Sequence, residues 1–210
     1  MESTSALRFL QQENTRLQEE NKALREDSLA FHHYMEALKD LYWATQRITS
    51  EENLFKLLDQ ILYNALGVLR AEDGSLLLLD EETSELVFVL VHGNIRNRLR
   101  GYRIKSNVGI AGWVISHREP LIVNNPRQDG RFSLDIDEEF SFITHSILCV
   151  PMITHGKLIG VIELLNKRDD EFTEADATLL LILGQVAAIA LEEMQTRLEA
   201  EEAKAVEASV

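Results

Sequence analysis

Residue types that commonly perform catalysis or bind metals are sparse in this 210-residue chain. Its single cysteine, Cys149, lies in an apolar run, so the chain can build neither a disulfide framework nor a cysteine-based zinc site. Gly109 and Gly112 stand in GIAGW, but the lysine and the following serine or threonine of a phosphate-binding loop are missing. These glycines are expected instead to permit the turn into a short helix that bears Trp113. No serine-nucleophile elbow, zinc-protease helix or kinase signature occurs. The sequence therefore predicts a protein that is not an enzyme.

The six histidines are scattered along the chain and predict no metal site. Adjacent His32 and His33 would point to different faces of a helix. His145 is the one candidate for a haem ligand, but no second haem signature accompanies it. The sequence names no cofactor, and whether one binds is left open.

The charge and hydropathy of the chain argue against two kinds of partner, nucleic acid and membranes. The formal net charge is -14, with acidic residues concentrated in the last twenty positions, and this disfavours a nucleic-acid surface. The N-terminus shows no secretory signal, and the longest apolar stretch, 179–191, is too short to span a bilayer. With its lone thiol, the protein is expected in the reducing cytoplasm, without a membrane partner.

One short segment carries an excess of positive charge, from Arg96, Arg98, Arg100, Arg103 and Lys105. The segment is expected to be a loop before the third strand. It could attract an anionic ligand or partner, or its charges could simply keep an exposed loop soluble.

A seven-residue repeat runs through residues 1–48. Its two series are Leu10, Leu17, Leu24, Phe31 and Leu38, and, three residues earlier, Leu7, Asn14, Asn21, Ser28 and Met35. This is the a and d pattern of a coiled coil. Asn14 and Asn21 favour a parallel two-stranded coil, because each asparagine can bond its symmetry mate. We expect a homodimer; the alternative is one amphipathic helix packed on its own domain.

Two further helices are predicted. After Ser50, a good N-cap, apolar residues at helical spacing continue to about Arg70. Thr173, with Asp176 three residues later, predicts a capping box that opens a long helix, apolar through Leu191 and acidic beyond.

Between these helices the chain changes to short β-like runs. The runs are 75–79, 86–91, 102–105, 121–123, 146–153 and 158–166. The connections at 80–84 and 154–157 are polar and too short for a crossover helix. The sheet is therefore expected to be mainly antiparallel.

Five segments taken together resemble a GAF domain. They are GIAGWVISHREPLIVNN (109–125), DGRF (129–132), FITHSILCVPM (142–152), KLIGVIELLNK (157–167) and FTEAD (172–176). The resemblance covers about residues 50–190 and is most similar to GAF domains of cyclic-nucleotide phosphodiesterases and adenylate cyclases. It implies an α+β fold: a six-stranded antiparallel sheet with flanking helices and a small-molecule pocket, here preceded by the long N-terminal coiled-coil helix.

The resemblance also implies roles for single residues. A structural clasp, in which Lys167 pairs with Asp176 and ties the strand end to the helix start, is implied for Asn166, Lys167, Phe172 and Asp176. Ligand contacts are implied for Ser75, Asp137, Thr144 and Glu163.

At other positions the sequence departs from the nucleotide-binding pattern. Ala177 replaces a usual glutamate after the aspartate of the signature. Val91 and His92 stand where relatives have a base-stacking phenylalanine and an aspartate, and Phe140 replaces a pocket threonine.

We therefore expect a coiled coil at 1–48, a GAF domain at 49–191 and an acidic helical extension at 192–210. The expected function is a non-catalytic regulatory sensor that signals to a partner protein through its dimer helices. A cyclic nucleotide, another small molecule and no ligand all remain open. The alternative function is a ligand-free dimeric scaffold for protein contacts.

Overall fold

The computed structural model describes residues 12–18, 21–22, 51–94, 96–168 and 171–207. The chain divides into two units, Met1–Trp43 and Ala44–Val210. In the first unit, residues 12–18 and 21–22 are helical, and Asn14 and Asn21 are exposed there. The rest of the expected coiled coil and the expected N-cap Ser50 lie outside the described residues.

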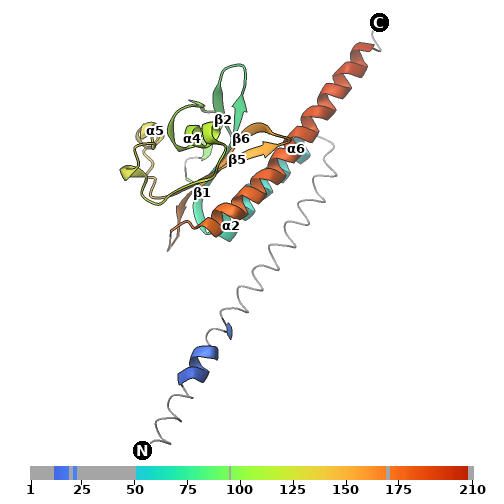
Figure 1. Ribbon diagram of the computed structural model, residues 1–210. Coiled ribbons are helices and arrows are strands. Elements are labelled where there is room, and N and C mark those ends of the chain that lie inside the picture. Colours follow the sequence, from blue (N-terminus) through green and yellow to red (C-terminus); the bar gives the residue numbers. More distant parts are fainter. Residues whose placement is uncertain (1–11, 19–20, 23–50, 95, 169–170, 208–210) are drawn as a thin grey trace, which may run out of the picture. The chain divides into compact units, whose positions relative to one another are not determined.

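The second unit is built on one six-stranded sheet within the described residues (Figure 1). Its strands are β1 (Ala71–Asp80), β2 (Glu85–His92), β3 (Arg103–Lys105), β4 (Leu121–Val123), β5 (Ile147–Thr154) and β6 (Lys157–Lys167). The order across the sheet is β3-β2-β1-β6-β5-β4, and every neighbouring pair is antiparallel. The short turns after β1 and β5 close hairpins, as the sequence predicted.

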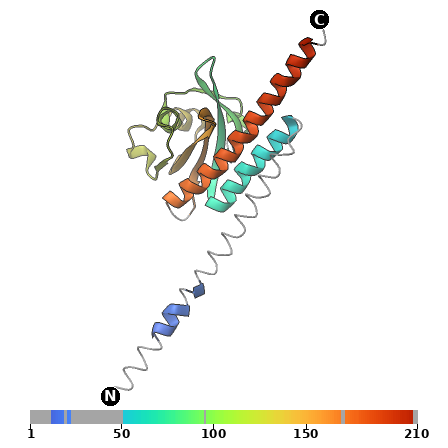
Figure 2. The same ribbon diagram turned by 45° about the vertical axis from the view of Figure 1, so that its right-hand side comes forward.

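Two helices, α2 (Glu51–Leu69) and α6 (Glu174–Glu207), lie side by side across one face of the sheet (Figures 1 and 2). Helix α2 buries apolar side chains at helical spacing, including Leu58, Ile61, Leu62 and Ala65. Helix α6 approaches the sheet closely at Gly184. A Cβ there would lie 3.3 Å from Ile162 and 3.4 Å from Val150.

Helix α6 continues without a break from the domain into the acidic C-terminal segment. The expected boundary at residue 192 is therefore not a change of structure. Thr173 and Asp176 form the predicted capping box: Asp176 N donates to Thr173 Oγ1 at 3.3 Å, and Thr173 N donates to Asp176 Oδ2 at 2.7 Å. Helix α6 is long and apolar enough to cross a membrane, but the core helices of soluble proteins also meet this criterion. Its buried residues include Leu180, Leu183 and Ala187.

The opposite face of the sheet carries shorter elements, α3 (Arg96–Leu99), α4 (Gly109–His117), the 3-10 turn η1 (Pro126–Gln128) and α5 (Asp135–Phe140). Of these, only α4 corresponds to a predicted element, the short helix that bears Trp113. Residues 96–99 form a helical turn rather than the expected loop. Strand β1 also begins earlier than predicted, at Ala71.

Alternation along β5 and β6 directs side chains to the two faces. Val150 and Ile162 face α6, because both lie close to Gly184. Cys149 and Val161 belong instead to the apolar cluster that includes residues of α4. Neighbouring positions of the same strands thus contact either the helix pair or the face that carries α4 and α5.

Candidate functional site

A cavity of about 390 Å³ lies on the α4 and α5 face of the sheet. Its walls come from β2, β3, β5 and β6, the start of α4, and the segment 132–144 that contains α5. Most lining side chains are apolar, and the polar ones include Asp137, Thr144 and Glu163. Ligand pockets typically measure roughly 300–1,000 Å³ and combine apolar walls with a few polar groups. The cavity fits this description.

Glu163 of β6 supplies the acidic group on the sheet side of the cavity. Its register partners are Ser75 on β1 and Cys149 on β5, so the three residues form one row across the sheet. Ser75 Oγ donates a hydrogen bond of 2.7 Å to Glu163 Oε1. Burial raises the pKa of the Glu163 carboxyl, and the Ser75 hydrogen bond lowers that pKa by less. Burial also raises the pKa of the Cys149 thiol well above its usual value.

Ser75 does not border the cavity, which differs from the expected direct ligand contact. Its side chain is buried at 2% exposure, and its hydroxyl orients Glu163. The structure therefore places Ser75 one contact behind the cavity surface.

Asp137 organises the segment 132–144 on the other side of the cavity. Its carboxylate accepts hydrogen bonds from Thr144 N at 3.0 Å, Thr144 Oγ1 at 2.6 Å and Arg127 Nη2 at 3.3 Å. The side chain is only 4% exposed, so these donors offset the cost of burying its charge. Asp137 and Thr144, both expected to contact a ligand, border the cavity and bind each other.

The same segment is fastened to the residues around α3. Arg98 donates to the carbonyl oxygens of Phe140 at 3.1 Å and Glu139 at 3.4 Å, and its guanidinium lies 5.1 Å from the centre of the Phe140 ring. Tyr102 donates its hydroxyl to Glu139 and packs edge-on against Phe140. Phe140 is buried but does not line the cavity. At the position where relatives have a pocket threonine, Phe140 therefore helps to attach the segment 132–144 to Arg98 and Tyr102.

Aromatic side chains line the cavity although the expected stacking position holds none. Phe88, Tyr102, Phe132 and Phe142 all border it. His92 points elsewhere, because its ring pairs with Asp59 of α2 at 2.9 Å. The aromatic surface of the cavity thus comes from these four residues and not from position 91, where relatives have the base-stacking phenylalanine. The signal for Phe88 was present in the sequence, since Leu86, Phe88 and Leu90 alternate as the buried side of β2.

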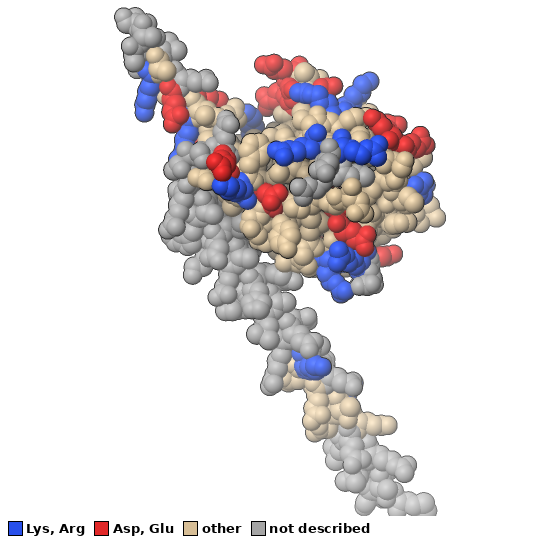
Figure 3. All heavy atoms as spheres, turned by 180° about the vertical axis from the view of Figure 1, so that it is seen from behind, with Lys and Arg blue, Asp and Glu red and all other residues tan. Residues whose placement is uncertain are grey.

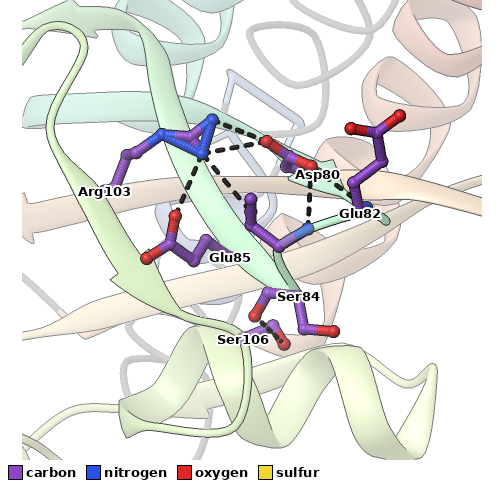
Figure 4. A network of polar contacts seen from close by, with 7 residues as sticks. Asp80, Glu82, Ser84, Glu85, Arg103 and Ser106 are labelled. Carbon is purple, nitrogen blue, oxygen red and sulfur yellow. Dashed lines mark hydrogen bonds and ion pairs between the residues drawn. The ribbon is translucent and has the colours of Figure 1, made fainter.

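Arg103 belongs to the basic segment, but its charge is already compensated (Figure 4). Its guanidinium pairs with Asp80 Oδ2 at 2.6 Å and with Glu85 Oε2 at 3.0 Å, across the β1–β2 hairpin. Lys105 also borders the cavity and forms no ion pair within the described part of the chain. In the view of Figure 3, basic side chains alternate with acidic and uncharged surface.

The glycines of GIAGW shape the start of α4. Gly109 has φ of +71°, in the left-handed region that glycine tolerates. A Cβ at Gly112 would lie 2.6 Å from the carbonyl carbon of Asn107, so the chain approaches itself too closely there for any other residue. Both glycines serve the turn into the helix, as the sequence predicted.

The four residues expected to form a clasp meet where β6 ends and α6 begins. Lys167 Nζ makes an ion pair with Asp176 and lies 5.6 Å from the centre of the Phe172 ring. Asn166 has φ of +58°, accepts from His145 N at 2.7 Å and donates to the buried Asp73 at 3.3 Å. The Lys167 and Asp176 side chains are only 11% and 13% exposed, so the pair is largely shielded from solvent.

Metal ligands do not gather in the part of the chain that the structure describes: it contains no group of three or more His, Cys, Asp or Glu residues suited to a metal ion. His145 is exposed, and its backbone N–H donates to Asn166.

Comparison with known proteins identifies the family. The family model for the GAF domain matches residues 53–191, well over half of the chain. The chain belongs to the GAF domain family. Solved GAF structures have the same fold: the GAF domain of a phosphoenolpyruvate-protein phosphotransferase from Coxiella burnetii superposes with a TM-score of 0.68 at 19% identity, covering 78% of this chain and 95% of that one. A free methionine-R-sulfoxide reductase from Neisseria meningitidis gives a TM-score of 0.64 at 20% identity, covering 78% and 91%.

Curated relatives of this GAF chain are cyclic-nucleotide phosphodiesterases. A probable 3',5'-cyclic phosphodiesterase of Caenorhabditis elegans is 30% identical over 141 residues, which cover 63% of this chain and 19% of the relative. The dual 3',5'-cyclic-AMP and -GMP phosphodiesterase 11 of Drosophila melanogaster is 29% identical over 163 residues, covering 70% and 11%. The GAF chain thus spans less than a fifth of the length of these relatives. GAF domains of phosphodiesterases are regulatory modules, and the region of this chain that matches these relatives is such a domain.

Proposed function

We propose that this chain is a non-catalytic GAF sensor that binds a small molecule in the cavity between the sheet and the segment 132–144. The observation that carries the proposal is the cavity itself, about 390 Å³ in volume, with Glu163 on one side and the Asp137–Thr144 pair on the other. A cavity of this size forgoes the van der Waals contacts that a close-packed core would make. Ligand binding gives that space a function.

A cyclic nucleotide is the first candidate ligand, because two relatives are named as cyclic-nucleotide phosphodiesterases. Three of the four expected ligand-contact residues, Asp137, Thr144 and Glu163, also border the cavity. Phe88 and the other cavity aromatics offer planar surfaces for a base. Other small molecules of similar size fit the same description. The proposed location is the cytoplasm, where the lone thiol stays reduced.

Occupancy is transmitted through the helix pair and the homodimer. Strand β6 carries Glu163 toward the cavity and Ile162 toward Gly184 of α6. A ligand that binds two arrangements of this strand with different affinity shifts α6, whose exposed C-terminal part reaches a partner protein. Asn14 and Asn21 set the register of the N-terminal coiled coil that brings two copies together.

The test combines native mass spectrometry of the purified chain with a thermal-shift panel that includes cyclic AMP and cyclic GMP. A bound ligand at 100 times its Kd stabilises the folded protein by about 2.7 kcal/mol. Ala111→Leu, which puts a larger side chain at the cavity wall, should abolish the shift, whereas Ala175→Leu on the exposed start of α6 should leave it unchanged. A chain with no co-purified molecule and no shift would instead be the ligand-free scaffold.

A further inference from the structure

Glu163 is an acidic group without a counter-charge on the wall of an apolar cavity. Ser75 Oγ donates to one carboxyl oxygen, Oε1. Oε2 has no hydrogen bond from any residue that the structure describes, and no ion pair within those residues includes Glu163. Among the described residues, one neutral donor is the only hydrogen-bond partner of this half-buried carboxylate, so a positive charge in the cavity would stabilise it further.

The charges around Glu163 do not meet this demand. Arg103 is held by Asp80 and Glu85 on the hairpin, and Arg127 is held by Asp137. Lys105 borders the cavity but lies beyond ion-pair distance of Glu163. The other titratable groups that line the cavity are Tyr102 before β3, Arg103 and Lys105 of β3, and Asp135 and Asp137 of α5. Cys149 of β5 does not line it but lies opposite Glu163 in the register of the sheet.

The remaining wall suits a flat cation. Phe88, Phe132, Phe142 and Tyr102 border the cavity from β2, from the segments beside α5 and from the residue before β3. The face of an aromatic ring attracts a cation, and a planar cation stacks on it with little loss of conformational entropy. The carboxylate oxygen left free by Ser75 can accept charge-assisted hydrogen bonds from the N–H groups of an amidinium or guanidinium.

We propose that the cavity selects a small planar organic cation whose N–H groups donate to the free oxygen of Glu163. This inference rests on the proposed function, since it names the chemical class of the ligand for the same cavity. The ligand class includes amidinium, guanidinium and protonated amino-heterocyclic head groups. Glu163 is the specificity-determining residue, and Ser75 is a positioning residue that fixes its carboxyl plane.

Three probes of nearly the same shape isolate the charge: benzamidine is a cation, benzamide is neutral and benzoate is an anion. Each is titrated into the full-length chain, with binding followed by ligand-observed NMR. We expect benzamidine to bind at least about tenfold more tightly than benzamide, since a charge-assisted pair is about twice as strong as a neutral one. Benzoate should bind more weakly than benzamide. Equal affinities for the three probes, tighter binding of benzoate, or no binding of benzamidine would overturn the inference.

Variants test whether the preference for benzamidine depends on the Glu163 carboxyl. Glu163→Gln keeps the shape and the Ser75 contact, and it should remove the preference for benzamidine while leaving benzamide binding in place. Glu119→Gln, which removes an exposed carboxylate outside the cavity lining, is the matched control and should keep the preference. Ser75→Ala should keep the preference for the cation with a smaller ratio, because the carboxyl loses its orienting donor. A preference that survives in Glu163→Gln would contradict the proposal.

The pH dependence of benzamidine binding provides a readout that a purely structural role would not change. Burial raises the pKa of Glu163, so the carboxyl becomes neutral sooner than an exposed one as the pH falls. Benzamidine stays cationic throughout, and its affinity should therefore rise with pH until Glu163 is ionised. Glu163→Gln should flatten this dependence. An affinity that falls with rising pH would refute the assignment.

Failure of this inference and failure of the proposed function give different results. If cyclic AMP or cyclic GMP shifts the melting temperature equally in wild type and Glu163→Gln while benzamidine does not bind, the sensor function stands and the cation preference is wrong. If none of these molecules binds and native mass spectrometry finds none, both fail.

Discussion

The ion pair between Lys167 and Asp176 should be among the costliest polar contacts to break in this domain. Both side chains are nearly buried, at 11% and 13% exposure. Asp176 also accepts hydrogen bonds from Thr173 N at 2.7 Å and Thr173 Oγ1 at 3.0 Å. One carboxylate therefore closes the helix cap and compensates the lysine at the end of β6.

The expected energies follow from these contacts. In Asp176→Ala the loss of the capping box costs about 1 kcal/mol. A fully buried charge left without its partner costs about 3–5 kcal/mol, and the residual exposure of Lys167 reduces that penalty. We expect a total loss of about 2–4 kcal/mol. Lys167→Met should cost less, about 1–2 kcal/mol, because Asp176 keeps both Thr173 donors and the favourable helix N-terminus.

A double-mutant cycle in urea, followed by far-UV circular dichroism, measures the coupling between the two side chains. The combined Lys167→Met and Asp176→Ala variant should be less destabilised than the sum of the single variants by about 1–2 kcal/mol. The exposed pair Glu52–Lys56 on α2 is the matched control and should show no measurable coupling. Coupling between Lys167 and Asp176 as small as in this control would refute the reasoning from burial.

Four further predictions test the rest of the structure. Asp137→Asn should cost about 1–3 kcal/mol in urea and weaken ligand binding, because the segment over the cavity loses a charged acceptor; unchanged stability would contradict that role. Gly160→Ala should destabilise the fold by about 3 kcal/mol or more, since its Cβ would lie 2.0 Å from the backbone oxygen of Leu77; a normal melting temperature would show that the strands separate easily there. The Arg131 guanidinium lowers the pKa of Asp129 from 3.8 to about 2, so its stabilisation is present above about pH 4 and is lost toward pH 2; Asp129→Asn should weaken this part of the acid sensitivity in pH-dependent melts. Removal of residues 1–45 should convert a dimer into a monomer in sedimentation experiments, and a monomeric full-length chain would exclude the coiled-coil dimer.

Local pattern was sufficient to predict much of the fold. The hairpins were found because short polar connections leave no room for a crossover helix, and the capping box at Thr173 marked the start of α6. Helix α5 was missed, because DIDEEF has only two apolar residues and too few turns to show a helical period. Its position depends instead on contacts from Arg98 and Tyr102, more than thirty residues away in the chain.

The pairing of neighbouring strands determines the contacts of two site residues, Arg103 and Ser75, that the sequence alone did not determine. The charge of Arg103 looked available for an anion until the antiparallel pairing of β2 with β3 placed it beside Asp80 and Glu85. Ser75 looked like a ligand contact by residue type, but the register of β1 with β6 sets it against Glu163. Both outcomes depend on which residues face each other, and residue type alone does not determine that register.

Strand β6 connects the cavity to α6, because the side chains of a β-strand alternate between its two faces. Successive residues point to opposite faces, so Glu163 borders the cavity while its neighbour Ile162 lies against α6 at Gly184. The contact is close, and a close-packed contact transmits a small displacement because no void absorbs it. The clasp at Lys167 and Asp176 holds the end of the same strand to the start of the same helix. A ligand that draws Glu163 toward the cavity therefore acts on α6 at two points, and weakening the clasp should reduce the response of α6 without removing the ligand site.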